Sequence, residues 1–380
     1  MGRFQGLLGA MALATLALGM GTAAQEDGIV AESLLAPRHI AYGADGTLWI
    51  AEAGSGGDVE TPSPLGMGKA GLTSRVTIVT PGGVQEALLG NLPSMDWGFN
   101  EMVGVNAVLP AGDSLWMAVG NGGGEATGGL TRGVYEWNIE TFEQLSVFDS
   151  LAAETELNPD GEIIDSNPMD IAVGADGTVY IADAGANTVW QIAPDATELA
   201  VFATWTDNPV PTSVEIDTDG DIWIGFLSGF PHLEGSARVE HYSPDGTLVE
   251  KFEGFTAVVD LALGEDGLYA VQYGIYGDAG FAPSSGSVVT VTADGPTPVL
   301  EEINYPFGLT LSPDGVWMVA YDTNFGQAPG MGRVGTADAV AESEVPAPVV
   351  TPEVTEGSSD EGDESNGEEI EPVTTPEVTQ

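Results

Sequence analysis

The chain has 380 residues, no cysteine and a formal net charge of −50, from 58 acidic and 8 basic side chains. A protein this acidic repels phosphate backbones and anionic lipid, so the composition excludes nucleic acid as a partner. Without cysteine there are no disulfides, thiol nucleophiles or iron–sulfur ligands, and the fold must rest on its apolar core.

The first 24 residues predict a secretory signal peptide. Arg3 supplies a short basic start, residues 7–18 form an apolar run, and small residues lead to Ala24, the predicted cleavage site. No other apolar stretch approaches the roughly 20 residues that a spanning helix needs. We therefore expect a secreted or periplasmic protein without membrane insertion.

One pattern of strand, turn and strand then recurs six times along the chain. Typical copies are "HIAYGADGTLWIAEAG" from residue 39 and "DIAVGADGTVYIADAG" from residue 170. Asp-Gly between alternating apolar runs is a strong hairpin signal, because glycine accepts a positive φ without steric cost. The aspartates that mark the six turns are Asp45, Asp113, Asp176, Asp219, Asp266 and Asp314.

The spacing of these turns predicts the fold. Successive turn aspartates are 68, 63, 43, 47 and 48 residues apart. A period in the forties is typical of one four-stranded blade of a β-propeller, and the two longer intervals indicate loops inserted in the first blades. We predict an all-β, six-bladed β-propeller of TolB-like architecture over residues 25–340.

Residues 341–380 have a different composition. They contain no aromatic residue, hold 12 of the 58 acidic residues, and repeat the motif Thr-Pro-Glu-Val-Thr. Such a segment cannot bury enough apolar area to offset the entropy of ordering, so it is predicted to be a disordered tail.

The innermost strands of a propeller line its central channel, and their first residues are the candidate site. If the six repeats keep one register, these residues form a ring at one depth. Carboxylate and amide oxygens with one imidazole suit a divalent cation, calcium above others. The alternative is a polar network with channel water and no ion. The predicted metal ligands are His39, Asn106, Asp170 and Asp260; Ser213 and Gly308 complete the ring.

The spacing of residues along the chain excludes several other kinds of catalytic or metal site. The three histidines do not form an H-E-x-x-H pair, and no G-x-S-x-G elbow occurs. The acidic run at residues 217–221 has its glycine in the wrong place for an EF-hand and fits a hairpin turn better. Aromatic residues on predicted loops could stack on a planar or sugar ligand, or could instead cap the blades: Trp97, Phe99, Phe230 and Tyr273.

Longer runs of sequence resemble the ScyD/ScyE family of exported propellers, which is related to NHL and gluconolactonase-like propellers. The matching runs include "PRHIAYGADGTLWIAEAGSGG" and "VPTSVEIDTDGDIWIGFLSGFPHLEGSARV". The resemblance implies the six-bladed fold and little chemistry. The chain departs from the family pattern at Met169-Asp170, two positions at which members of the family commonly have Tyr-Gly. Likeness to gluconolactonases implies one divalent ion held by Asn106, Asp170 and Asp260, with Glu52 or Asp183 as base.

Three functional hypotheses follow. The first is a binding or scaffold propeller that recognises a small molecule, a glycan or a protein through its loop face, and that we expect to be a monomer. The second is a divalent-metal-dependent hydrolase, like a lactonase or esterase, that uses the channel mouth. The third, implied by the resemblance to the ScyD/ScyE family, is an accessory enzyme of secondary metabolism. The first is favoured because the sequence shows no positioned pair of acid and base.

Overall fold

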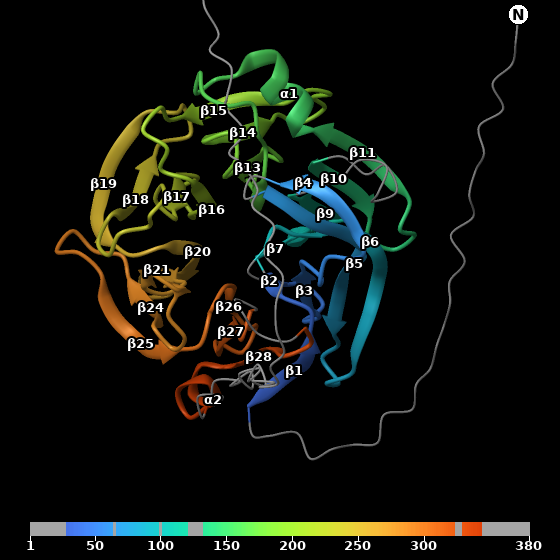
Figure 1. Ribbon diagram of the computed structural model, residues 1–380, viewed down its shortest axis with the longest axis vertical. Coiled ribbons are helices and arrows are strands. Elements are labelled where there is room, and N and C mark those ends of the chain that lie inside the picture. Colours follow the sequence, from blue (N-terminus) through green and yellow to red (C-terminus); the bar gives the residue numbers. More distant parts are fainter. Residues whose placement is uncertain (1–27, 64–65, 99–100, 121–131, 324–328, 344–380) are drawn as a thin grey trace, which may run out of the picture. The chain divides into compact units, whose positions relative to one another are not determined.

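The computed structural model describes residues 28–63, 66–98, 101–120, 132–323 and 329–343. Six antiparallel sheets form a ring around a central channel, with β2, β16, β20 and β26 near its centre (Figure 1). The six-bladed propeller is thereby confirmed. The predicted signal peptide and almost all of the predicted tail lie outside the described residues. Helix α2 (Ala337–Ala341) follows the last strand and ends one residue beyond the predicted boundary at 340.

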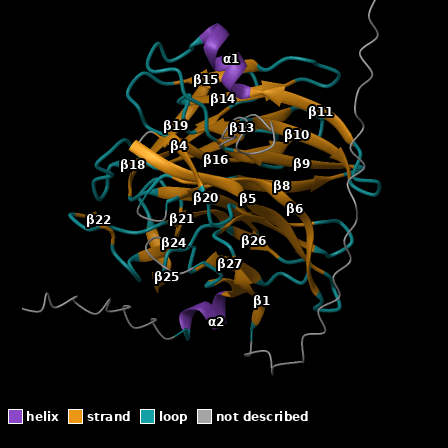
Figure 2. Ribbon diagram, turned by 45° about the vertical axis from the view of Figure 1, so that its right-hand side comes forward, coloured by secondary structure: helices purple, strands orange, loops and turns teal. Residues whose placement is uncertain are grey.

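Each blade begins with its innermost strand. Strands dominate the described residues, and the two helices are short (Figure 2). Blade one contains β2 (Pro37–Tyr42), β3 (Leu48–Glu52), β5 (Gly66–Val79) and β6 (Gln85–Asp96), with β4 (Val59–Ser63) and β7 (Met102–Val103) added. Blade two contains β8 (Val105–Ala111), β9 (Ser114–Val119), β10 (Gly133–Asn138) and β11 (Gln144–Asp149), after which α1 (Ser150–Leu157) leads to blade three.

The next three blades follow the same order. Blade three contains β12 (Pro168–Val173), β13 (Val179–Asp183), β14 (Thr188–Ile192) and β15 (Ala200–Thr204). Blade four contains β16 (Pro211–Ile216), β17 (Ile222–Phe226), β18 (Ala237–Tyr242) and β19 (Leu248–Phe255). Blade five contains β20 (Val258–Gly264), β21 (Gly267–Gln272), β24 (Gly286–Thr290) and β25 (Thr297–Ile303), with the small hairpin of β22 (Tyr276–Gly277) and β23 (Gly280–Phe281) inserted.

Blade six is built from both ends of the propeller. It contains β26 (Leu309–Leu311), β27 (Trp317–Tyr321) and β28 (Gly332–Thr336), and β1 (Ile29–Leu34) supplies its fourth, outermost strand. Ile29 lies opposite Gly335 in this antiparallel pair. The first strand of the propeller therefore closes the ring against the last one.

The Asp-Gly turns are built as the sequence predicts. In blade one, the Asp45 carboxylate accepts hydrogen bonds from the backbone amide and the hydroxyl of Thr47, at 3.0 and 2.9 Å. Between them, Gly46 has φ +81°, a conformation that glycine adopts freely. Blade three repeats this arrangement with Asp176 and Thr178.

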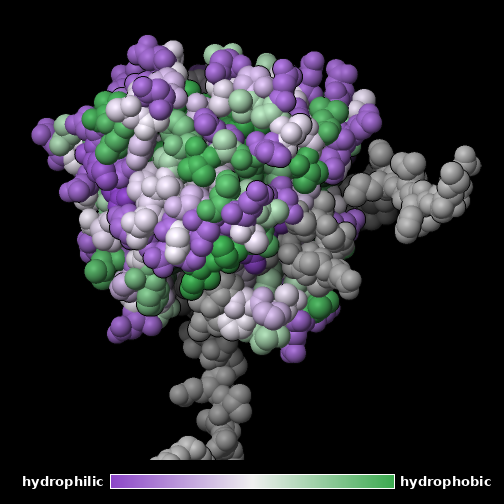
Figure 3. Space-filling model, turned by 90° about the horizontal axis from the view of Figure 1, so that it is seen from above, coloured by the Kyte–Doolittle hydropathy of each residue, from purple (hydrophilic) through white to green (hydrophobic). Residues whose placement is uncertain are grey.

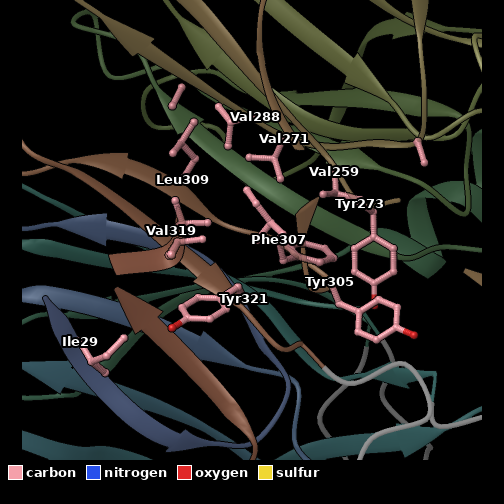
Figure 4. Close-up of a cluster of buried hydrophobic side chains, with 14 residues drawn as sticks. Ile29, Val259, Val271, Tyr273, Val288, Tyr305, Phe307, Leu309, Val319 and Tyr321 are labelled. Carbon is pink, nitrogen blue, oxygen red and sulfur yellow. The ribbon is translucent and has the colours of Figure 1, made fainter. Parts of the chain in front are cut away.

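The core lies between neighbouring blades, where apolar side chains of facing sheets pack together. One cluster joins blades five and six and includes Val271, Phe307 and Val319 (Figure 4). The outer surface is mostly hydrophilic on the face seen in Figure 3. In the part of the chain that the structure describes, neither helix has the length and apolar character needed to cross a membrane.

Candidate functional site

A β-bulge near the start of the inner strand sets the candidate site. In blade three, Pro168 pairs with Asp183 and Asp170 pairs with Ala182, so one extra residue, Met169, is inserted. Blades four and five contain the same irregularity before Ser213 and Asp260. A bulge re-aims the side chain beside it. Repetition of the bulge therefore brings side chains from separate blades together at one depth of the channel.

His39, Asp170 and Asp260 meet there and form what we call the channel triad. His39 Nδ1 lies 3.0 Å from Asp260 Oδ1 and 3.4 Å from Asp170 Oδ1. The ligand atoms of the three residues all lie within 4.8 Å of one another, a separation that one metal ion could bridge. The structure thus brings together three of the four predicted ligands.

Both carboxylates also accept hydrogen bonds from the protein. Asp170 Oδ2 accepts from the Ser213 hydroxyl at 3.0 Å and from the Val214 amide at 2.9 Å. Asp260 Oδ2 accepts from the Leu309 amide of blade six at 2.7 Å. Backbone donors of blades four and six therefore hold the negative charges of blades three and five, and the triad joins several blades by polar contacts.

The charges of the triad are coupled. Burial alone would lower the pKa of His39, but the carboxylates of Asp170 and Asp260 outweigh burial and raise it to about 9. Burial raises the pKa of Asp170 to about 6, against the attraction of protonated His39. At neutral pH, without a metal, a protonated imidazole therefore lies between the two acids.

The fourth predicted ligand, Asn106, lies outside the triad. Ala107 pairs with Ala118 as Asp170 pairs with Ala182, so Ala107 holds the ring position in blade two. Ala107 also lies six residues before the turn aspartate Asp113, as Asp170 lies six residues before Asp176, so the prediction of Asn106 was wrong by one residue. The Asn106 amide instead donates to the Pro168 carbonyl at 2.8 Å and ties blade two to blade three.

A cavity of about 370 Å³ extends from the triad along the inner strands. Aliphatic residues form most of its lining, and Glu215 of β16 is its one carboxylate besides those of the triad among the described residues. Burial, reinforced by the charges of Asp170 and Asp260, raises the pKa of Glu215 to about 8. Glu215 was not among the predicted site residues, although it lies two positions after Ser213 on the same strand, the spacing at which side chains return to one face.

Glu52 and Asp183, the two expected bases, lie away from this cavity. Glu52 is fully buried and accepts hydrogen bonds from Arg75, Thr77 and the Leu35 amide. Asp183 is also fully buried and accepts four hydrogen bonds, including one from the Trp190 indole. Both carboxylates hold loops to their blades, and the geometry does not support the expected role as base.

Two of the four predicted loop aromatic residues, Phe230 and Tyr273, lie in one cluster of rings. The loop after β17 and the segment around β22 and β23 form what we call the aromatic loop cluster, made by Phe230, His232, Tyr273, Tyr276 and Phe281. The Phe230 side chain is 75% exposed, and its ring centroid lies 5.7 Å from that of Tyr276. Trp97 lies in a different loop, on blade one, and Phe99 lies outside the described residues.

A chain of aromatic contacts links this cluster to the triad. Tyr273 contacts Phe281 with ring centroids 4.9 Å apart, and Phe307 lies 6.2 Å from Tyr273. Phe307 in turn packs edge-on against His39 at 5.5 Å. Figure 4 shows Tyr273, Tyr305 and Phe307 close together in this region. The loop face and the channel are therefore linked through the rings of Tyr273 and Phe307.

Comparison with known proteins supports the fold and leaves the activity open. The chain matches no protein-family model and no curated protein sequence. An oxidoreductase from Thermus thermophilus described as a glucose dehydrogenase is similar in structure, with TM-score 0.50 and 13% identity, over 81% of this chain and 98% of that one. A streptogramin B lyase has TM-score 0.46 and 12% identity, over 80% and 94% of the two chains. A Bacteroides thetaiotaomicron protein of unknown function has TM-score 0.48 and 13% identity, over 80% and 70%.

Proposed function

We propose that this chain is an exported binding propeller of the ScyD/ScyE type that holds its ligand on the loop face, at the aromatic loop cluster. The observation that carries the proposal is the exposure of Phe230 beside packed rings. Leu233, in the same loop, is 62% exposed, and Ile275 of blade five is 44% exposed. Large exposed apolar side chains on loops of a rigid scaffold are typical of recognition surfaces.

The charge of the protein narrows the class of ligand. With 58 acidic and 8 basic residues, the chain repels anions over its whole surface. The aromatic loop cluster offers ring faces and edges together with the His232 imidazole and the Tyr276 hydroxyl. A neutral glycan fits this chemistry, because a sugar presents an apolar face for the rings and hydroxyls for the polar groups.

Phe230→Ala is expected to weaken glycan binding while leaving the fold intact, because the exposed ring supplies contact area to the ligand and little to the core. The measurement is binding of the mature protein to an array of neutral oligosaccharides, followed by calorimetry on the best binder. We expect a loss of affinity of at least about tenfold, as at interface positions where truncation costs more than 1 kcal/mol. Val299→Ala, an exposed apolar residue on the outer strand β25, is the matched control. Absence of binding to every oligosaccharide, or equal binding by the Phe230 variant, would exclude the proposal.

A second candidate function, metal-dependent hydrolysis in the channel, is favoured by the channel triad. One imidazole nitrogen and two carboxylate oxygens are a ligand set that holds a divalent ion and leaves positions open for water. An ion can bind there only when His39 has lost its proton. Ion binding therefore competes with the form in which protonated His39 is hydrogen-bonded to the two carboxylates. Glu215, which faces the same cavity, is the residue placed to exchange a proton with a bound substrate.

Titration of Ca²⁺ and Zn²⁺ into chelator-treated protein tests this candidate. If the triad holds an ion, wild-type protein should bind one equivalent in the channel and release a proton as His39 deprotonates. His39→Gln should remove the proton release and weaken binding in the channel, whereas His241→Gln, in the half-buried group of Asp217, Asp221 and His241 on blade four, should leave the channel equivalent unchanged. If His39→Gln binds as wild type does, the ion does not use the triad.

A further inference from the structure

Helix α1 and the turn that follows it carry buried oxygen atoms that accept no hydrogen bond from the described residues. Among those residues, neither carboxylate oxygen of Glu154 has a donor, and the Glu154 side chain is fully covered. The Oδ1 atom of Asn158 is also buried and has no donor in the described part of the chain. Burying an oxygen atom costs free energy when no protein donor replaces the water that it bound. Three such atoms on one helical turn therefore require an explanation.

The two side chains are placed to act together. The Asn158 backbone amide donates to the Glu154 carbonyl at 2.8 Å, so the residues are one turn apart on the same side of the helix. Asn158 ends α1 with φ 36° and ψ 64°, and its side-chain nitrogen donates to the Glu162 carbonyl. That bond fixes the amide orientation and leaves Oδ1 as the free acceptor.

The surroundings are strongly acidic. Burial, and then the charges of Asp160, Asp183 and Asp165, raise the pKa of Glu154 to about 7. Asp160 is 4% exposed, and each of its oxygens accepts one hydrogen bond, Oδ2 from the Asn187 side chain and Oδ1 from the Glu162 amide. Asp165 forms an ion pair with Arg132, the one such pair made by these four acids among the described residues. The negative charge around Glu154 therefore exceeds the positive charge.

We propose that this turn is a binding site for a calcium ion, held by the Glu154 carboxylate, Asn158 Oδ1 and the Asp160 carboxylate. These ligands are all oxygen atoms, and they combine two carboxylates with one amide, a set typical of calcium. Calcium takes six to eight oxygens in flexible geometry, so water completes the shell. Asp183 is excluded as a ligand because each of its oxygens already accepts two hydrogen bonds, whereas each oxygen of Asp160 accepts one.

Such an ion would act on the link between blades two and three. Helix α1 lies in the segment that connects β11 to β12, and Asp160 reaches blade three through Asn187. Calcium would neutralise the acids and hold the helix end against blade three. The site is separate from the channel triad and from the aromatic loop cluster.

Glu154→Gln, which keeps the shape and removes the charge, tests the proposal by calcium calorimetry and thermal unfolding of the whole mature chain. Asn158→Gly, which keeps the left-handed backbone and removes the oxygen, is the second variant. Wild type should bind calcium and melt at a higher temperature with it, and each variant should weaken that binding by at least about tenfold, since ligand charge and number set calcium affinity. Glu156→Gln, exposed on the same helix, is the control and should match wild type.

Two results would overturn the proposal. One is a wild-type protein whose melting temperature and calorimetric heat do not respond to calcium at millimolar concentration. The other is a calcium response of equal size in wild type, Glu154→Gln and Asn158→Gly, which would place any bound ion elsewhere, for instance in the channel. Because the channel variants leave α1 unchanged, the two sites are told apart by which substitution removes the response.

Discussion

Asp260→Ala is expected to lower the free energy of unfolding by about 3–5 kcal/mol, the cost of removing one partner from a buried charged network. Asp260 is 3% exposed and receives hydrogen bonds from blade six through the Leu309 amide and from blade one through His39. Removing the Asp260 carboxylate leaves the Leu309 amide and His39 buried without their acceptor. The protonated His39 imidazole then has one carboxylate beside it, that of Asp170, instead of two. Urea unfolding measures the loss as a lower midpoint at an unchanged slope.

Asp266→Ala is the matched control for this experiment. Asp266 lies in the turn of the same hairpin but is exposed to solvent, so its removal should change stability by no more than about 0.5 kcal/mol. If the two variants unfold at the same urea concentration, the contacts of Asp260 do not stabilise the ring. Aromatic and aliphatic packing between blades would then supply that stability.

The metal-free protein is expected to lose stability as the pH rises from 6.5 to about 9. His39 has its ordinary pKa of 6.5 when the chain is unfolded and a pKa of about 9 in the folded protein. Its contribution is therefore complete below pH 6.5 and is lost as the pH rises through the folded pKa. The difference between the two pKa values corresponds to about 3 kcal/mol at 1.36 kcal/mol per unit.

The measurement compares unfolding free energies of wild type and His39→Gln across this pH range. The difference in unfolding free energy between wild type and His39→Gln should become steadily smaller from pH 6.5 to 9. His232→Gln is the control, because burial lowers the pKa of His232, and a lowered pKa gives no loss of stability as the pH rises. A constant gap between wild type and His39→Gln would show that the His39 imidazole is not protonated in the folded protein.

The repeat in the sequence predicted the fold because hairpin chemistry is local. Asp45, Gly46 and Thr47 specify their turn by contacts within three residues, and six such turns at a blade period leave few alternatives to a propeller. The positions of His39, Asp170 and Asp260 followed from the same register. Local pattern thus carried the fold and three of the four predicted metal ligands.

Asn106 was misplaced by one residue, because Ala107 lies six residues before Asp113, as His39 lies six residues before Asp45. The remaining features depend on contacts that a linear pattern does not contain. The raised pKa of Glu215 depends on charges from blades three and five. Glu154 reads as an ordinary acid on a short surface helix, and only the packing of the α1 segment shows that its carboxylate is covered.

The closure of blade six has a consequence for how this protein reaches its folded state. Strand β1 is synthesised first, yet its partner β28 comes about 300 residues later, since Ile29 lies opposite Gly335. Contacts between residues so distant in sequence form slowly, because the long loop between them must first be closed. Until then β1 and the incomplete blade expose strand edges that can pair with other chains. A chain cut short before Gly332 would keep those edges open and would be prone to aggregate.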